Sequence, residues 1–137
     1  PGLPVYCHPA DFGEGETTGM FGERFPTVRS FGDITPYREG DVVDVDGIRI
    51  EVLETPGHTP GSVTLRSEDV LFTGDTLFAG SMGRTDFPGG DEGQIMRSLK
   101  RLGELPGDYQ VLPGHEEQTT LERERRSNYC LREAMGR

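Results

Sequence analysis

The sequence contains no tryptophan, and it has two cysteines and three histidines in 137 residues. The isolated thiols of Cys7 and Cys130 make neither a disulfide framework nor a paired-cysteine zinc motif, and they suit a reducing compartment such as the cytoplasm. No apolar run approaches the roughly 18 residues that cross a bilayer, so no membrane partner is expected. The net charge of −10 argues against a nucleic-acid partner, because binding to a phosphate backbone needs a basic surface.

The residues that are present indicate one small folded domain over residues 1–137. Hydrophobic residues make up 32% of the chain and gather in periodic runs, while 20 glycines and 10 prolines predict many turns. Residues 9–39 carry little periodic signal. We interpret them as a long irregular segment of the kind that often forms a lid or a binding loop.

Alternating apolar residues predict several strands. Two such runs flank Asp46-Gly47, a dipeptide that favours a two-residue hairpin turn because both positions tolerate positive φ. The continuous apolar run over 70–72 favours a strand that is covered on both faces. Other strands are predicted over residues 5–7, which we expect to be buried, and over 63–65 and 109–112.

Capping residues predict two helices. The first begins after Asp91, which is expected to accept from the amide three residues later, with Gln94 bonding back to it, and it stops at Gly103. The second is predicted to begin near Thr119, where Thr119-x-x-Glu122 has the pattern of a capping box.

Three residues with chemically useful side chains share one position relative to the strands. His58, Asp75 and His115 each follow a glycine just beyond a predicted strand end. Strands that run the same way end at one edge of a sheet, where functional sites collect. Two imidazoles and one carboxylate are a ligand set suited to Zn²⁺, Fe²⁺ or Mn²⁺. Taken singly, each residue has a structural alternative, as a loop histidine or a turn-capping aspartate, and we interpret His8 as a non-ligand.

Three segments in order, TPGHTPGSVTL, LFTGDTLFAGSMGRTDFPGGD and VLPGHEEQTTLERERRSN, resemble successive blocks of the metallo-β-lactamase-fold hydrolases. The branch that they resemble is glyoxalase II, the hydroxyacylglutathione hydrolases, over about residues 1–130. The resemblance implies an α+β fold, an αββα sandwich with its site at the edge between two sheets. It also implies metal ligands at His58 and His115, and a catalytic, metal-bridging carboxylate at Asp75. Zinc, as one or two ions, is the expected cofactor, with iron or manganese as alternatives.

One motif of that family is absent. The sequence contains no His-x-His-x-Asp-His, which in the family precedes the stretch resembling LPVYCHPAD. The chain therefore resembles the C-terminal part of the domain. We expect an N-terminal segment or a second chain to supply the remaining ligands.

The sequence carries only some of the features that favour a glutathione substrate. Arg84 stands nine residues past Asp75, where the family places a basic residue on a glutathione carboxylate. The alternative is that Arg84 forms a salt bridge with Asp86 or Asp91. Glu117 occupies a position where the family has a tyrosine that contacts glutathione. A glutathione thioester is therefore a weaker expectation than metal-dependent hydrolysis itself.

Three hypotheses follow for function. The first is a metal-dependent hydrolase of a thioester or related ester that uses metal-activated water on a small-molecule substrate. The second is an iron persulfide dioxygenase, which the chain resembles at Gly83–Phe87 and which uses two histidines and one carboxylate. The third is a non-catalytic, incomplete domain that needs an N-terminal partner segment and exposes a sheet surface for association.

Overall fold

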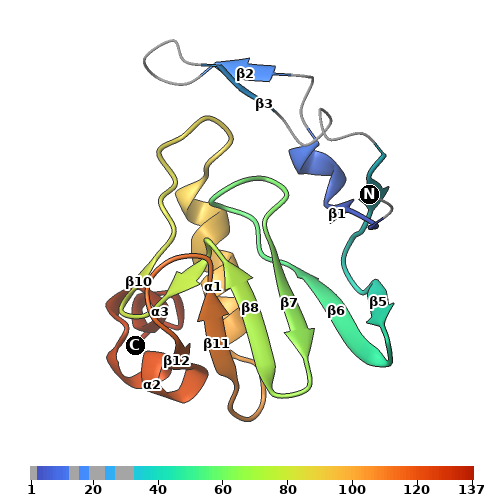
Figure 1. Ribbon diagram of the computed structural model, residues 1–137. Helices are drawn as coiled ribbons and strands as arrows, with labels where there is room; N and C mark the ends of the chain where they lie inside the picture. The colour runs from blue at the N-terminus through green and yellow to red at the C-terminus, as the bar shows by residue number, and fades with distance from the viewer. Residues whose placement is uncertain (1–2, 13–15, 19–23, 27–32) are drawn as a thin grey trace.

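A six-stranded mixed sheet organises the chain. The computed structural model describes residues 3–12, 16–18, 24–26 and 33–137, which form the predicted α+β arrangement (Figure 1). From one edge to the other the strands follow the order β12-β11-β8-β7-β6-β5. Their bounds are β5 Val42–Val45, β6 Ile48–Glu54, β7 Val63–Ser67, β8 Val70–Gly74, β11 Gln110–Pro113 and β12 Thr119–Thr120.

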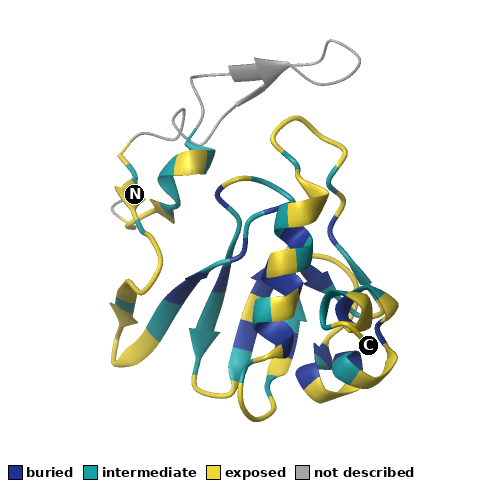
Figure 2. Ribbon diagram, turned by 180° about the vertical axis from the view of Figure 1, so that it is seen from behind, coloured by how far each residue is buried: buried dark blue, intermediate teal, exposed yellow. Residues whose placement is uncertain are grey.

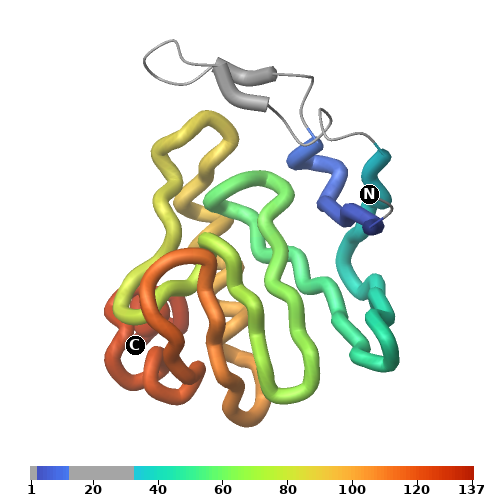
Figure 3. The backbone as a smooth tube through the Cα atoms, in the orientation of Figure 1, coloured from blue at the N-terminus to red at the C-terminus, as the bar shows by residue number. Residues whose placement is uncertain are grey.

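Three of these strands end at the same edge of the sheet. Strand β7 pairs antiparallel with both β6 and β8, and β8 pairs parallel with β11, so β6, β8 and β11 run in one direction. Figure 3 shows the turns that follow them side by side at the upper end of the sheet. The predicted convergence of the three strand ends is confirmed.

The predicted hairpin over β5 and β6 is also confirmed. Val45 pairs directly with Ile48, which leaves Asp46 and Gly47 as a two-residue turn. Both turn residues have positive φ, 51° for Asp46 and 88° for Gly47. This is the backbone that the Asp-Gly dipeptide favours in hairpins.

Helix α1, Glu92–Gly103, covers one face of the sheet, as Figure 2 shows from behind. Leu99 and Leu102 are fully buried against Leu71 and Val111 of the sheet, in one hydrophobic core. Asp91 caps the helix by accepting from the Gln94 amide at 2.9 Å. The reciprocal half of the predicted cap is replaced by a different bond, because the Asp91 amide donates to the Gly57 carbonyl at 2.8 Å.

The opposite face of the sheet is open, and the prediction of a doubly covered strand over 70–72 is wrong. Leu71 is fully buried under α1, whereas Phe72 is 42% exposed. On the same face, Val45 and Ile48 are 49% and 58% exposed. The physical reason is that α1 lies behind the sheet, and no described element lies in front of this part of it (Figure 1).

The C-terminal region differs from the single helix predicted from Thr119. Thr119 belongs to β12, and Thr120 caps the helix that follows by accepting from the Arg123 amide. The chain then breaks at Asn128, whose side chain accepts from the Leu131 amide and begins a new helix. The two helices are α2 Leu121–Ser127 and α3 Tyr129–Ala134.

The N-terminal segment lies beside the upper end of β6. Strand β1 (Tyr6–Cys7) pairs parallel with β4 (Thr35–Pro36), and a 3-10 turn, η1, spans Pro9–Asp11. The strand over 5–7 exists as predicted, but it is not buried, because Tyr6 is 38% exposed. The remaining short strands are β2 Glu16–Thr18, β3 Arg24–Pro26, β9 Leu77–Phe78 and β10 Ser81–Met82.

Much of the predicted lid over 9–39 lies outside the described residues. Within the described part of the chain, no helix combines the length and the apolar character needed to cross a membrane.

Candidate metal centre

Asp75 lies between His58 and His115 at the edge where the three strands end. Its Oδ2 atom is 3.2 Å from Nε2 of His58, and its Oδ1 atom is 3.4 Å from Nε2 of His115. The side chains of His58 and Asp75 are 19% and 28% exposed, whereas His115 is 70% exposed. The structure therefore brings together all three residues that the sequence singles out, as two pairs that share one carboxylate.

Glycines make this close approach feasible. The Gly114 amide donates to the Gly74 carbonyl at 2.7 Å, which ties the end of β11 to the end of β8. A Cβ atom on Gly114 would lie only 2.6 Å from Oδ1 of Asp75. Only glycine fits at position 114 without displacing the carboxylate that the two histidines share.

The His58 ring is held in one orientation by its second nitrogen. Nδ1 lies 2.7 Å from the Arg84 carbonyl oxygen, which can only accept, so Nδ1 carries a proton and donates. In the neutral ring this leaves a lone pair on Nε2, the atom that faces Asp75. A lone pair and a carboxylate attract each other only with positive charge between them, which a proton or a metal ion supplies.

The loop that carries His58 packs tightly against α1. The Asp91 amide holds the Gly57 carbonyl, and Ser98 Oγ donates to the Pro56 carbonyl at 2.7 Å. A Cβ atom on Gly57, whose φ is 142°, would lie 2.3 Å from Cβ of Ile95. The proline-and-glycine frame around His58 thus sets the backbone against the first turns of the helix.

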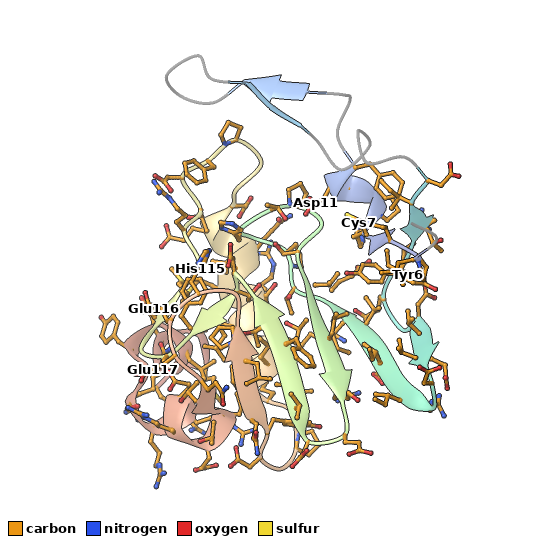
Figure 4. The ribbon with its side chains drawn as sticks, viewed as in Figure 1. Tyr6, Cys7, Asp11, His115, Glu116 and Glu117 are labelled. Atoms are coloured by element: carbon orange, nitrogen blue, oxygen red, sulfur yellow. The ribbon has the colours of Figure 1, made fainter. Side chains whose placement is uncertain are left out.

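His115 is held mainly by an aromatic contact. Phe78 of β9 meets the His115 ring edge to face, with 5.9 Å between ring centroids. Figure 4 shows His115 at the same end of the sheet as Asp11, with Glu116 and Glu117 beyond it on the exposed loop. Sequence reasoning missed Phe78, because a phenylalanine in a short apolar run carries no signal for contact with a distant histidine.

The donor set of two imidazoles and one carboxylate fits a metal ion. Two ligand atoms that are each about 2.0–2.1 Å from one tetrahedral zinc ion lie roughly 3.3 Å apart. The two nitrogen-to-oxygen distances around Asp75 bracket that value. Among residues 3–12, 16–18, 24–26 and 33–137, however, no three His, Cys, Asp or Glu side chains form a ready-made metal-binding group. The arrangement suits one metal position on each carboxylate oxygen better than a three-ligand site.

Two hollows flank the Asp75 carboxylate. One, of about 460 Å³, lies on the His115 side and the other, of about 430 Å³, lies on the side of the N-terminal segment. His58 and Asp75 line both hollows. The first is also lined by Phe78, Met82, Arg84, Phe87 and His115, and the second by Cys7, His8, Asp11, Tyr37 and Thr59.

Arg84 is engaged by Asp86. Its Nε and Nη2 atoms each lie 2.6 Å from a different oxygen of the Asp86 carboxylate, and the guanidinium sits 4.0 Å over the Phe87 ring. The hydrogen bonds from Arg84 lower the pKa of Asp86 to about 2. Of the two aspartates considered as alternatives, Asp86 is the partner, because Asp91 caps α1. A substrate role for Arg84 stays a prediction.

Comparison with known proteins identifies the family. Residues 1–115 match the metallo-beta-lactamase superfamily. The chain belongs to this superfamily. A hydroxyacylglutathione hydrolase, GloC, of Haemophilus influenzae is 43% identical over 97 residues, which cover 69% of this chain and 46% of that protein. An uncharacterized protein of Mycobacterium tuberculosis is 38% identical over 148 residues, covering 95% of this chain. The resemblance to the hydroxyacylglutathione hydrolases is confirmed.

Solved structures support the same fold for this metallo-beta-lactamase superfamily chain. BLEG-1 B3 metallo-beta-lactamase matches with a TM-score of 0.79 at 32% identity, covering 94% of this chain and 65% of that one. TTHA1623 in a di-iron-bound form matches with a TM-score of 0.71 at 36% identity, covering 93% and 64%. ETHE1 from Myxococcus xanthus matches with a TM-score of 0.66 at 40% identity, covering 69% and 44%.

The chain spans only part of these relatives. It covers 65% of the length of the Mycobacterium tuberculosis protein and less than half of GloC. Activity, substrates and partners of the whole protein are therefore matters for proposal.

Proposed function

We propose that this chain carries metal-binding residues of a hydrolase that acts on a thioester or a related ester. His58 and His115 each hold a metal position, and Asp75 is the catalytic carboxylate that joins the two positions. Zinc is the proposed metal, as one or two ions, with iron or manganese as alternatives. The observation that carries the proposal is that the two histidines approach different oxygens of one carboxylate.

The chain's own residues prepare this edge for a metal ion and a substrate. The bond from Nδ1 of His58 to the Arg84 carbonyl directs the other ring nitrogen toward Asp75. A divalent metal bound there supplies Lewis acidity toward a carbonyl oxygen and lowers the pKa of water. Phe78 and Phe87 line the hollow on the His115 side and give a substrate an apolar wall.

A glutathione thioester is the proposed small-molecule substrate. Two observations support it: the name of the Haemophilus influenzae relative, and the place of Arg84 on the wall of the hollow beside Asp75. To bind a substrate carboxylate, Arg84 must first release the carboxylate of Asp86. The two unpaired thiols, Cys7 and Cys130, fit a cytoplasmic protein.

Metal binding by the purified chain tests the proposal directly. We expect Zn²⁺ to bind, and expect His58→Ala and Asp75→Ala each to remove stoichiometric binding, as measured by elemental analysis after gel filtration. Asp44→Ala is the matched control, because Oδ1 of Asp44 accepts from the Gly47 amide at 2.9 Å in the β5–β6 turn, away from the site. Unchanged zinc content in both site variants would refute the assignment. A thioester hydrolysis assay on the same samples tests the reaction class.

An iron persulfide dioxygenase is the second candidate. Two histidines and one carboxylate are the donor set of mononuclear non-haem iron oxygenases, and His58, His115 and Asp75 supply that set. The di-iron-bound relative supports iron as a metal that this fold accepts. Stoichiometric iron together with oxygen uptake on glutathione persulfide would favour this candidate over the hydrolase.

The open face of the sheet favours a role for a partner segment. Val45, Ile48 and Phe72 are exposed on it. In a third candidate the chain is catalytically inactive by itself and associates with an N-terminal segment or a second chain that covers this face. Hydrolysis that appears only when such a segment is added would support it.

A further inference from the structure

The loop that bears His58 is clamped from the N-terminal segment by the carboxylate of Asp11. Thr59 Oγ1 donates to Oδ2 of Asp11 at 2.5 Å, and the Gly61 amide donates to Oδ1 at 2.8 Å. Asp11 ends the 3-10 turn η1, far from His58 in sequence, and Figure 4 shows it at the same end of the sheet as His115. Both carboxylate oxygens accept a hydrogen bond, and the two donors, Thr59 and Gly61, lie within three residues after His58.

The loop sequence is adapted to this contact. A Cβ atom on Gly61 would lie 2.6 Å from Cγ of Asp11, so a side chain at position 61 would push the carboxylate out. Pro60 has no amide hydrogen, so Asp11 is bound by the Thr59 hydroxyl and the Gly61 amide on either side of it. Ser62 Oγ accepts from the Thr59 amide at 3.1 Å and closes the turn.

The two sides of the loop are therefore held by different parts of the protein. On one side Gly57 packs on α1 and its carbonyl accepts from Asp91. On the other side the carboxylate of Asp11 supplies the contact. His58 stands between these anchors, and its ring is aimed by the Arg84 carbonyl.

A purely structural role for Asp11 fits the surroundings less well. The turn η1 has no buried residue, and it sits outside the hydrophobic core formed by the sheet and the helices. Loss of the Asp11 carboxylate removes little core packing, so its effect falls on the loop.

We propose that Asp11 is a positioning residue for His58, and that it restricts the loop so that Nε2 of His58 stays directed at Asp75 and at a metal ion held there. The inference rests on the metal-binding role proposed for His58. The Asp11 side chain acts through Thr59 and Gly61 and does not touch the metal.

Cobalt titration of the purified chain, followed by visible absorption, provides the first test. Groups that orient a metal ligand typically change metal affinity by about 10–100-fold when removed. Because Asp11 acts through the loop, we expect Asp11→Ala to weaken Co²⁺ binding by about tenfold and to change the ligand-field bands. Asp11→Asn should restore most of the affinity, because its amide oxygen accepts from Gly61 and its amide nitrogen donates to the Thr59 hydroxyl.

Hydrogen exchange without metal provides the second test. The Gly61 amide should exchange faster in Asp11→Ala than in the original chain, while amides in α1 keep their protection. Asp44→Ala is the matched control, because Oδ1 of Asp44 also accepts from a glycine amide in a turn, that of Gly47 at 2.9 Å, away from the site. This control should leave the cobalt spectrum unchanged.

The outcomes separate the two proposals. If the original chain binds no Co²⁺, the proposed function and the positioning role both fail. If it binds Co²⁺ and Asp11→Ala binds equally well with an unchanged spectrum, the positioning role alone is overturned. Should Asp11→Ala fail to fold, Thr59→Val removes one of the two bonds with little change in volume. That variant must weaken binding in the same direction for the inference to stand.

Discussion

Arg84 and Asp86 form a two-point ion pair on the wall of the hollow beside Asp75, with two nitrogens of the guanidinium each 2.6 Å from a different carboxylate oxygen. The pair lies at the surface, since the two side chains are 56% and 62% exposed. It is nevertheless reinforced by Phe87, over whose ring the guanidinium lies. Arg84, which the sequence predicts to bind a substrate carboxylate, therefore already binds a carboxylate of its own chain.

The first prediction concerns the titration of Asp86. Its pKa in the folded protein is about 2, below its ordinary value of 3.8, because the Arg84 guanidinium donates hydrogen bonds to the ionised carboxylate. The contribution of the pair to stability is thus complete above about pH 4 and is lost as the pH falls toward 2. NMR titration of the Asp86 side-chain carbon should show a midpoint near 2. In Arg84→Ala the midpoint should return toward 3.8, and an unchanged midpoint there would contradict the pairing.

The second prediction concerns a buried carboxylate behind the site. Glu124 is 1% exposed and accepts from the Gly80 amide, from Thr119 Oγ1 and from Asn128 Nδ2. Glu124→Ala removes all three hydrogen bonds and leaves the buried Thr119 hydroxyl without this acceptor, whereas Asn128 Nδ2 keeps its bonds to the Phe78 and Ser81 carbonyls. Since a hydrogen bond to a charged group is worth about 1.5–3 kcal/mol, we expect the free energy of unfolding to fall by about 3 kcal/mol or more.

Urea denaturation measures this loss. Glu133→Ala is the matched control, because Glu133 lies exposed on α3 and should change the free energy of unfolding by less than about 0.5 kcal/mol. Equal losses in the two variants would show that the Glu124 network does not stabilise the fold.

The third prediction concerns the open face of the sheet. Ile48 and Phe72 expose more than two fifths of their side chains on one apolar surface, and such surfaces promote association. We expect the chain to self-associate as its concentration rises, as measured by sedimentation velocity. The double variant Ile48→Thr and Phe72→Thr should shift this association to higher concentration.

A control for that prediction lies on the same strand. Arg49 follows Ile48 and points to the other face of β6, because successive strand residues alternate between faces. Arg49→Thr should leave the association unchanged. A chain that stays monomeric at every concentration would contradict the prediction.

Sequence patterns predict the site residues that directly follow strand ends. His58, Asp75 and His115 each stand after a glycine beyond a strand, and the direction of β6, β8 and β11 brings them to one edge. Contacts made by side chains from distant segments carry no such pattern. Asp11 reaches the His58 loop from a stretch without periodic signal, and Phe78 reaches His115 across the fold.

The fold shows a similar division. The Asp46-Gly47 hairpin follows from local backbone preferences and was predictable. The break between α2 and α3 was not, because Asn128 fits the helical pattern until its side chain caps the Leu131 amide. The apolar run over 70–72 predicts an apolar surface on both sides of a strand, but composition cannot say which surface this chain covers.

The order of the strands has a consequence for how the edge assembles. His58 follows β6 and Asp75 follows β8, and these two strands are joined through β7, which pairs antiparallel with both. His115 arrives only after α1 has crossed behind the sheet and β11 has paired parallel with β8. Contacts between segments close in sequence form fastest, so we expect the first histidine and the aspartate to meet early in folding and His115 to join last. By the same reasoning, when the chain begins to unfold, His115 should be the first of the three residues to leave the site.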